Sequence, residues 1–211
     1  WEHEKGVIYF NKGNYRDALT IFAELVQYKY APARYYVSLC YRDGKGVGKN
    51  PVNSMKFLLE AAKRGYAPAQ YDLAVEFDKG NVLERNDSLA HHWYETAAGN
   101  EEPRALLEMA HRYRDGKGVA QDNAKSIGLL ARAAELKEPC ASYEYAMHLI
   151  AEGNGGTAYM VTAADLGNEK AMIHMFDYLD GQKKYDEAYR YAKMLSDAGN
   201  HEGTRRVADY Y

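Results

Sequence analysis

One loop of this sequence carries glycines and lysines of the kind that could cradle a phosphate. It reads Gly44-Lys45-Gly46-Val47-Gly48-Lys49. However, the loop follows an expected helix instead of a strand, and it lacks the Gly-Lys-Ser/Thr ending of a P-loop. The alternative is a turn that needs the φ and ψ freedom of glycine. The sequence favours that structural interpretation, because the first four residues of the loop, Gly44 to Val47, recur later in phase with the rest of the chain.

The histidines are the second candidates for chemistry, as ligands of a metal ion. His91 and His92 stand beside Trp93 in an expected helix, without the His-Glu-x-x-His spacing of a zinc site. Three more come from successive helices at different offsets, so they need not converge: His111, His148 and His174. A solvated or packing role is favoured over a shared metal site. Because no acid, base and nucleophile converge either, we expect no enzyme and no cofactor.

The elements that would position these residues recur along the chain. The pentapeptide Asp43 to Val47 returns 72 residues later as Asp115 to Val119. Another segment, Tyr30-Ala31-Pro32-Ala33, returns at half that interval, 36 residues later, as Tyr66-Ala67-Pro68-Ala69. A unit of roughly 36 residues is typical of helical solenoids. Glycine-rich loops such as Gly44 to Asn50 and Gly116 to Gln121 separate one apolar period from the next, which indicates two helices per unit.

The first helix of each unit is marked by a small residue, with apolar or aromatic residues four and eight places later. Offsets of zero, four and eight lie on one helical face, so this stripe should be buried. The stripe consists of Ala33, Val37 and Tyr41; Ala69, Leu73 and Phe77; Ala105, Met109 and Tyr113; Ala141, Tyr145 and Leu149; and Ala171, Met175 and Leu179.

The second helix of each unit has its own stripe, which begins at a small residue and continues with two residues, mostly bulky, three and four places later. The small residues are Ala18, Ser54, Ala90, Ser126, Gly156 and Ala188. A closing glycine is expected to end most copies with a positive φ, at Gly65, Gly99, Gly167 and Gly199. Asp87 and Asp122 are expected to cap helices, and Pro51, Pro103 and Pro139 suit first turns.

These units resemble Sel-one-like repeats (SLR), a subfamily close to tetratricopeptide repeats. The shared pattern is alanine, leucine-glycine, tyrosine, a Gly-x-Gly-Val loop, then alanine, tryptophan-tyrosine, alanine-alanine and glycine. Residues 33–65, 69–99 and 105–134 match it best, while Asn81-Val82-Leu83 and Lys137 depart from it. The resemblance implies an all-α fold, a right-handed α-α superhelix or solenoid. It also implies an adaptor that assembles protein complexes, usually without catalytic activity.

We therefore expect a single repeat domain over residues 1–211, with about six helix-turn-helix repeats and a terminal helix. The expected units are 2–30, 31–66, 67–100, 101–138, 139–168 and 169–200, followed by a helix over 201–211 that ends at Tyr211. Cys40 and Cys140 lie nearly three repeats apart, so no disulfide between them is expected.

The face opposite the buried stripe of the first helices carries the functional signal. Its slots, at offsets two, six and nine, should be polar if they only meet water. Instead, tyrosines and aliphatic residues recur there, and in solenoids of this kind the first helices line the concave surface. We predict a concave groove for a protein or peptide partner, although packing between neighbouring helices is the alternative. Its residues are Tyr35, Leu39, Arg42, Tyr71, Val75, Leu107, His111, Arg114, Tyr143, Met147 and Ile150.

Composition limits the other partners and leaves the compartment open. The formal net charge of −3 gives no overall reason to expect nucleic acid, and no apolar run approaches the roughly 18 residues of a membrane helix. The chain opens with Trp1 and shows no basic-then-apolar leader, so we expect that the native N-terminus, with any signal peptide, has been removed or lies outside this sequence. A cytoplasmic and a periplasmic or secreted protein both remain open. The favoured function is a non-enzymatic scaffold, and the alternative is a dedicated inhibitor or immunity-type protein for one bacterial effector.

Overall fold

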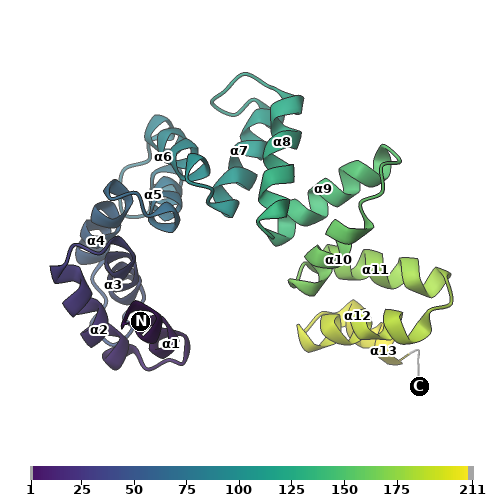
Figure 1. The fold of residues 1–211 in the computed structure, drawn as a ribbon, viewed down its shortest axis with the longest axis horizontal. Helices are drawn as coiled ribbons and strands as arrows, with labels where there is room; N and C mark the ends of the chain where they lie inside the picture. The colour runs from purple at the N-terminus through teal and green to yellow at the C-terminus, as the bar shows by residue number, and fades with distance from the viewer. Residues whose placement is uncertain (1, 209–211) are drawn as a thin grey trace. The chain divides into compact units, whose positions relative to one another are not determined.

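The computed structural model describes residues 2–208, and thirteen α-helices account for the secondary structure of these residues (Figure 1). The predicted all-α repeat fold is confirmed. The helices are α1 (Glu2–Asn11), α2 (Tyr15–Gln27), α3 (Ala31–Asp43), α4 (Pro51–Lys63), α5 (Ala67–Lys79), α6 (Asp87–Gly99), α7 (Pro103–Asp115), α8 (Asn123–Glu135), α9 (Pro139–Ala151), α10 (Thr157–Asp165), α11 (Glu169–Gly181), α12 (Tyr185–Asp197) and α13 (His201–Ala208).

The chain divides into two compact bodies, each larger than a single repeat, which are described separately. From here on they are called unit 1 and unit 2, and the segments of about 36 residues are called repeats. Unit 1 runs from Trp1 to Ala105 and unit 2 from Leu106 to Tyr211. In unit 1, α1 packs on α2, α3 on α4 and α5 on α6, and α2 and α4 also contact the first helix of the following pair. In unit 2, α9 packs on α10, α11 on α12, and α13 on α12. Each helix therefore contacts mainly its neighbours along the chain, as expected of a repeat protein.

Short polar residues start the second helices of three consecutive repeats. The side chains of Asn50, Asn86 and Asp122 each accept a hydrogen bond of 2.9 Å from the backbone N–H three residues later. The predicted cap at Asp122 is thus confirmed, but the one at Asp87 is wrong, because Asp87 is the first helical residue and Asn86 caps it. Pro51, Pro103 and Pro139 begin their helices as predicted.

The residue that closes each second helix adopts a positive φ whether or not it is glycine. Gly65, Gly167 and Gly199 do so, with φ of 83°, 95° and 80°. The prediction for Gly99 is wrong, because Gly99 is still helical and the equivalent residue is Glu101, with φ of 57°. Lys137 occupies the same position one repeat later, with φ of 60°.

The loops between the two helices of successive repeats close in the same way despite different sequences. The backbone N–H of Asn50 donates to the Tyr41 carbonyl at 2.8 Å, that of Asn86 to Phe77 at 2.9 Å, and that of Asp122 to Tyr113 at 2.8 Å. Residues 81–83 lack the glycines of the other two loops, yet their loop keeps this hydrogen bond. Closure of the loop by this hydrogen bond therefore needs no glycine at residues 81–83.

The predicted stripes form the core. The five small residues that open the stripe of the first helices are fully buried, and so are Leu73 and the second-helix residues Ala18, Ala90 and Ala188. The aromatic residues at offset eight, such as Tyr41, Phe77 and Tyr113, are only half-buried. Alternation of small and bulky residues lets neighbouring helices approach closely, which is how a repeat stack buries a core without a central helix.

The end of α9 and the start of α10 depart from the regular repeat. Gly156 does not lie within the second helix, as its place in the predicted stripe would require, but precedes α10 with a φ of 103°. A Cβ atom there would lie 2.6 Å from the Ala146 carbonyl oxygen, so only glycine fits. The helix α10 is consequently short, at 9 residues. At the C-terminus, α13 is confirmed as far as Ala208, and the predicted end at Tyr211 lies outside the described residues.

Candidate interaction surface

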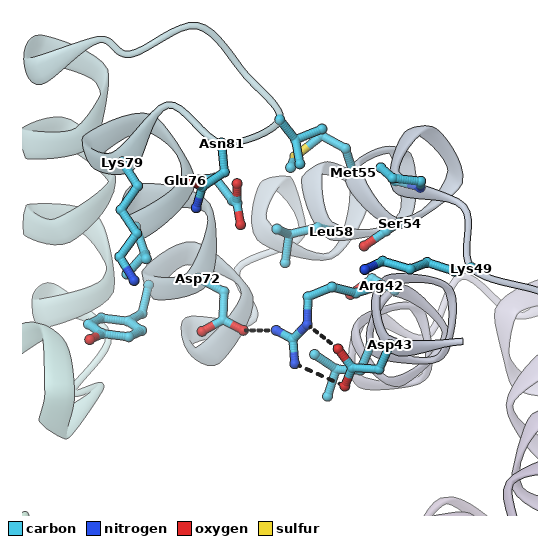
Figure 2. A pocket seen from close by; sticks show the side chains of 16 residues that line it. Arg42, Asp43, Lys49, Ser54, Met55, Leu58, Asp72, Glu76, Lys79 and Asn81 are labelled. Atoms are coloured by element: carbon cyan, nitrogen blue, oxygen red, sulfur yellow. Dashed lines mark hydrogen bonds and ion pairs between the residues drawn. The ribbon is translucent and has the colours of Figure 1, made fainter. Parts of the chain in front are cut away.

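A cavity of about 550 Å³ opens in unit 1 between α3, α4 and α5. Four of the predicted groove residues line it, namely Leu39 and Arg42 from α3 and Tyr71 and Val75 from α5. Figure 2 shows this cavity from close by, with Arg42 labelled. The helical offsets of these four residues, six and nine in α3 and two and six in α5, bring them to the same opening. The structure therefore places these four predicted residues together, on the surface of two consecutive first helices.

The charge of Arg42 is held within the protein. Its guanidinium makes a two-point contact with the Asp43 carboxylate, at 2.8 and 3.3 Å, and its Nη1 lies 3.8 Å from Asp72 Oδ2 (Figure 2). The hydrogen bond to Asp43 raises the pKa of Arg42 further. Arg42 thus lines the cavity, but its charge is already paired.

Tyr35 does not line this cavity. Its hydroxyl donates a 2.9 Å hydrogen bond to Asp72 Oδ2, and its ring packs on the buried cluster around Leu73. Burial and the neighbouring Asp72 carboxylate raise the pKa of Tyr35, so the phenol stays protonated. Tyr35 therefore joins one repeat to the next, which is the packing role that the sequence left open for these slots.

Asp72 and Arg104 are residues of this surface that the sequence analysis did not select. Arg104 Nη1 lies 3.4 Å from Asp72 Oδ1, and its guanidinium lies 4.3 Å from the centroid of the Tyr71 ring. Such stacking is a cation–π contact. The Asp72 carboxylate thus accepts a hydrogen bond from the Tyr35 hydroxyl and forms ion pairs with Arg42 and Arg104. These contacts fix the side chains around the cavity.

In unit 2, a second cavity of about 500 Å³ is lined by the predicted residues Arg114 and Tyr143, and also by Cys140, Glu144 and Lys170. Arg114 binds its neighbour Asp115 at 2.9 Å and Glu144 at 3.3 Å. His111 Nε2 lies 2.9 Å from Glu144 Oε1. This hydrogen bond raises the pKa of His111, against the effect of burial.

The two units share one charged arrangement. Arg42 reaches Asp72 in unit 1, and Arg114 reaches Glu144 in unit 2, with both partners displaced by 72 residues. In each case an arginine at offset nine of one first helix pairs with an acid at offset three of the next. This spacing is a signal in the sequence that could have identified Asp72 and Glu144.

The remaining predicted residues do not line either cavity. Leu107 is half-buried on α7, and Met147 and Ile150 on α9 are each 38% exposed. The five side chains that decide between an open surface and packing are Tyr35, Tyr71, Leu107, Tyr143 and Met147, and none of them is fully buried. Their role in docking a partner stays a prediction.

The histidines, the glycine-rich loop and the cysteines were the other candidates for chemistry. Within residues 2–208, no three histidine, cysteine or acidic side chains come together as a metal site. Gly44 and Gly46 adopt φ of 72° and 73°, the conformation expected of a turn. Cys40 is buried and Cys140 exposed, and both thiols are free. Among the described helices, none has the length and apolar character to cross a membrane.

Comparisons with known proteins identify the repeat. The Sel1 repeat model matches residues 31–66, 67–100, 103–138 and 169–200. The chitin synthase regulator SKT5 of Saccharomyces cerevisiae is 38% identical over 77 residues, which are 36% of this chain and 11% of that protein. This chain thus spans only about a tenth of that relative.

Two solved structures share the fold. A Sel1 repeat protein from Oxalobacter formigenes superposes with a TM-score of 0.79 and 22% identity, over 99% of this chain and 89% of the other. An immunity protein of Pseudomonas aeruginosa gives a TM-score of 0.61 and 17% identity, over 91% of this chain and 82% of the other. Because the repeat model covers more than half of the sequence, the chain belongs to the Sel1 repeat family.

Proposed function

We propose that this chain is a protein-interaction scaffold that binds a peptide or protein segment on the surface of its first helices. Sel1 repeat proteins mediate protein–protein interactions, and the fold is typical of non-catalytic scaffolds. The observation that carries the proposal is the cavity of unit 1, where Leu39, Tyr71 and Val75 meet on one surface. Apolar and aromatic side chains gathered at an opening mark an interaction site more often than a solvated face.

The side chains of this opening are already fixed in place. Tyr71 is held by the Arg104 guanidinium, and Arg42 is held by Asp43 and Asp72. A partner would therefore lose little additional side-chain entropy on binding, which favours affinity. Tyrosine also offers a large apolar ring and a polar tip, the combination enriched at protein interfaces.

Substitution of Tyr71 by alanine tests the proposal. We expect Tyr71→Ala to weaken binding of the native partner at least tenfold, about 1.4 kcal/mol, because the aromatic anchor that the partner would cover is lost. The partner is captured from extracts of the source organism, and its affinity for the purified chain is then measured by calorimetry.

Tyr185→Ala is the matched control, since Tyr185 is exposed on α12, a second helix, and lines neither cavity. Circular dichroism should show that both variants keep their helices. Equal affinity of the wild type and Tyr71→Ala for the captured partner would contradict the proposal.

A second candidate is a dedicated inhibitor or immunity-type protein for a single effector. It is supported by the Pseudomonas aeruginosa immunity protein, whose fold matches this chain over most of both lengths. The two candidates differ in the partner recovered. One enzyme-like protein bound tightly and alone would favour the inhibitor, whereas several proteins bound in one assembly would favour the scaffold.

A further inference from the structure

One carboxylate oxygen of Glu76, in the unit 1 cavity, is buried without a hydrogen-bond partner. Glu76 lies on α5, one turn after Asp72, and lines the opening. The oxygen is Oε2, which is shielded from solvent. Buried polar atoms almost always have a partner, so an exception of this kind needs an explanation.

The contrast with Asp72 is sharp, although both carboxylates belong to the same helix. Asp72 receives the Tyr35 hydroxyl at 2.9 Å, Arg104 at 3.4 Å and Arg42 at 3.8 Å. In Figure 2 the Arg42 guanidinium lies between Asp43 and Asp72, while the Glu76 carboxylate lies apart from it. The cations of this cavity edge therefore contact Asp72, while the Oε2 atom of Glu76 has no donor.

The next repeat places an arginine at this position. Glu108 and Arg112 stand 36 residues after Asp72 and Glu76, and Arg112 Nε binds Glu108 Oε1 at 3.0 Å. An acid followed four residues later by an arginine stabilises a helix, whereas two acids at this spacing repel each other. At the position of Glu76 on α5, the equivalent residue of α7 is therefore a cation paired with an acid.

We propose that this cavity receives the side chain of a lysine or arginine from the partner segment, and that Glu76 binds its cationic group. The inference rests on the proposed scaffold function and names the chemistry that the surface would recognise. Leu39 and Val75 line the same cavity and suit the aliphatic stem of such a side chain. Because Oε2 is shielded from solvent, the Glu76 carboxylate would turn toward the opening to meet the cation. The bound cation would then supply the donor that Oε2 lacks and reduce the repulsion between Glu76 and Asp72.

Two lysines also line the cavity and favour an anion as the competing occupant. Lys49 and Lys79 are both exposed, so water already solvates their ammonium groups. A carboxylate oxygen removed from water gains more from a new partner than an exposed ammonium does. A basic side chain is therefore the favoured occupant. Lys79 would compete with this side chain for the Glu76 carboxylate.

A titration of the full chain with a small probe tests this inference. The probe is N-acetyl-lysine N-methylamide, and its neutral comparison is N-acetyl-norleucine N-methylamide, which keeps the stem and lacks the ammonium. We expect the lysine probe to shift the backbone NMR signals of Leu39 and Val75 saturably, and the norleucine probe to shift them far less.

Three substitutions assign the effect to Glu76. Glu76→Gln should weaken binding of the lysine probe at least tenfold, whereas Glu95→Gln, on the exposed face of α6, should leave it unchanged. Glu76→Arg copies the Glu108 and Arg112 arrangement, so it should keep the fold through a pair with Asp72 and abolish binding. Lys79→Met removes the competing cation and should strengthen binding.

The inference is overturned if the lysine probe gives no saturable shift at tens of millimolar. It is also overturned if norleucine binds equally well, if Glu76→Gln binds like the wild type, or if Lys79→Met weakens binding of the lysine probe. Its failure is distinct from that of the scaffold proposal. A native partner that is lost with Tyr71→Ala and kept at full affinity by Glu76→Gln would leave the scaffold standing and remove only the basic side chain.

Discussion

Glu144 is the residue on which the polar contacts of the first-helix surface in unit 2 converge. It accepts from His111 at 2.9 Å and from Arg114 at 3.3 Å. Burial alone would raise the pKa of Glu144, but the hydrogen bond from His111 and the charge of Arg114 lower it overall. Because the same contact raises the pKa of His111, the pair is most stable with the histidine protonated and the glutamate ionised.

The stability of the protein should consequently depend on pH through His111. A folded-state pKa above the unfolded value of about 6.5 means that the contribution is fully present below that value, and is lost as the pH rises through the folded-state pKa. Between about pH 6 and pH 8, the wild type should lose more unfolding free energy than His111→Gln. Urea unfolding at several pH values measures this difference, with His92→Gln on α6 as the control. Parallel curves for the wild type and His111→Gln would contradict it.

For individual residues, the sequence predicts which face of a helix a side chain occupies better than it predicts the partner of that side chain. Offsets along the first helices placed Leu39, Tyr71 and Val75 on one surface, because helical geometry alone decides which residues share a face. The offsets did not reveal that Tyr35 turns its hydroxyl to Asp72, since that depends on an acid one repeat away. Unpaired acids such as Glu76 are equally invisible, because pairing is a property of the folded neighbourhood.

Helix ends show what individual elements tolerate. Glu101 and Lys137 occupy the left-handed position that Gly65 fills elsewhere, and the surrounding hydrogen bonds are the same. The backbone N–H of Gly65 donates to Ala62 at 3.0 Å, and that of Glu101 to Ala98 at 3.0 Å. The loop hydrogen bonds therefore hold a conformation that a side chain disfavours, which costs roughly 1–2 kcal/mol for a residue other than glycine.

Lys137→Gly should stabilise the protein by about 1 kcal/mol, because glycine adopts the positive φ without steric cost. The reverse change, Gly65→Lys, is the matched control and should destabilise by a similar amount. Urea unfolding of both variants and the wild type measures the two effects. A Lys137→Gly variant that is no more stable than the wild type would show that the backbone there is not strained.

The elements themselves could be predicted almost completely. The apolar period and the recurring loops indicate paired helices, and the structure has them. The errors at Gly99 and Asp87 amount to one or two residues at helix ends, where several neighbouring residues can end or cap a helix equally well. Gly156 could not be placed, because its position depends on the close approach of the Ala146 carbonyl.

At the scale of the whole molecule, contacts between neighbouring helices imply that stability is a sum of local terms. Each compact unit has its own fully buried leucine, Leu73 in unit 1 and Leu195 in unit 2. Removing either should leave a cavity whose cost is borne mainly by the unit that contains it.

Leu73→Ala should destabilise unit 1 by about 2–5 kcal/mol and leave unit 2 largely unaffected. Hydrogen exchange followed by mass spectrometry should show faster exchange of amides up to residue 105 and little change beyond it. Leu195→Ala is the reciprocal control and should show the opposite pattern. Equal acceleration in both units for either variant would mean that the chain unfolds as one cooperative body.

The identical closure of the loops at Asn50, Asn86 and Asp122 has a consequence for how such a chain can change its length. Equivalent backbone positions recur every 36 residues, so a cut at one of them and a join at the next removes a whole module and leaves the ends in matching orientation. Deletion or duplication of one module would therefore preserve the frame of the array. Gene recombination can lengthen or shorten a protein of this kind without inventing a new junction.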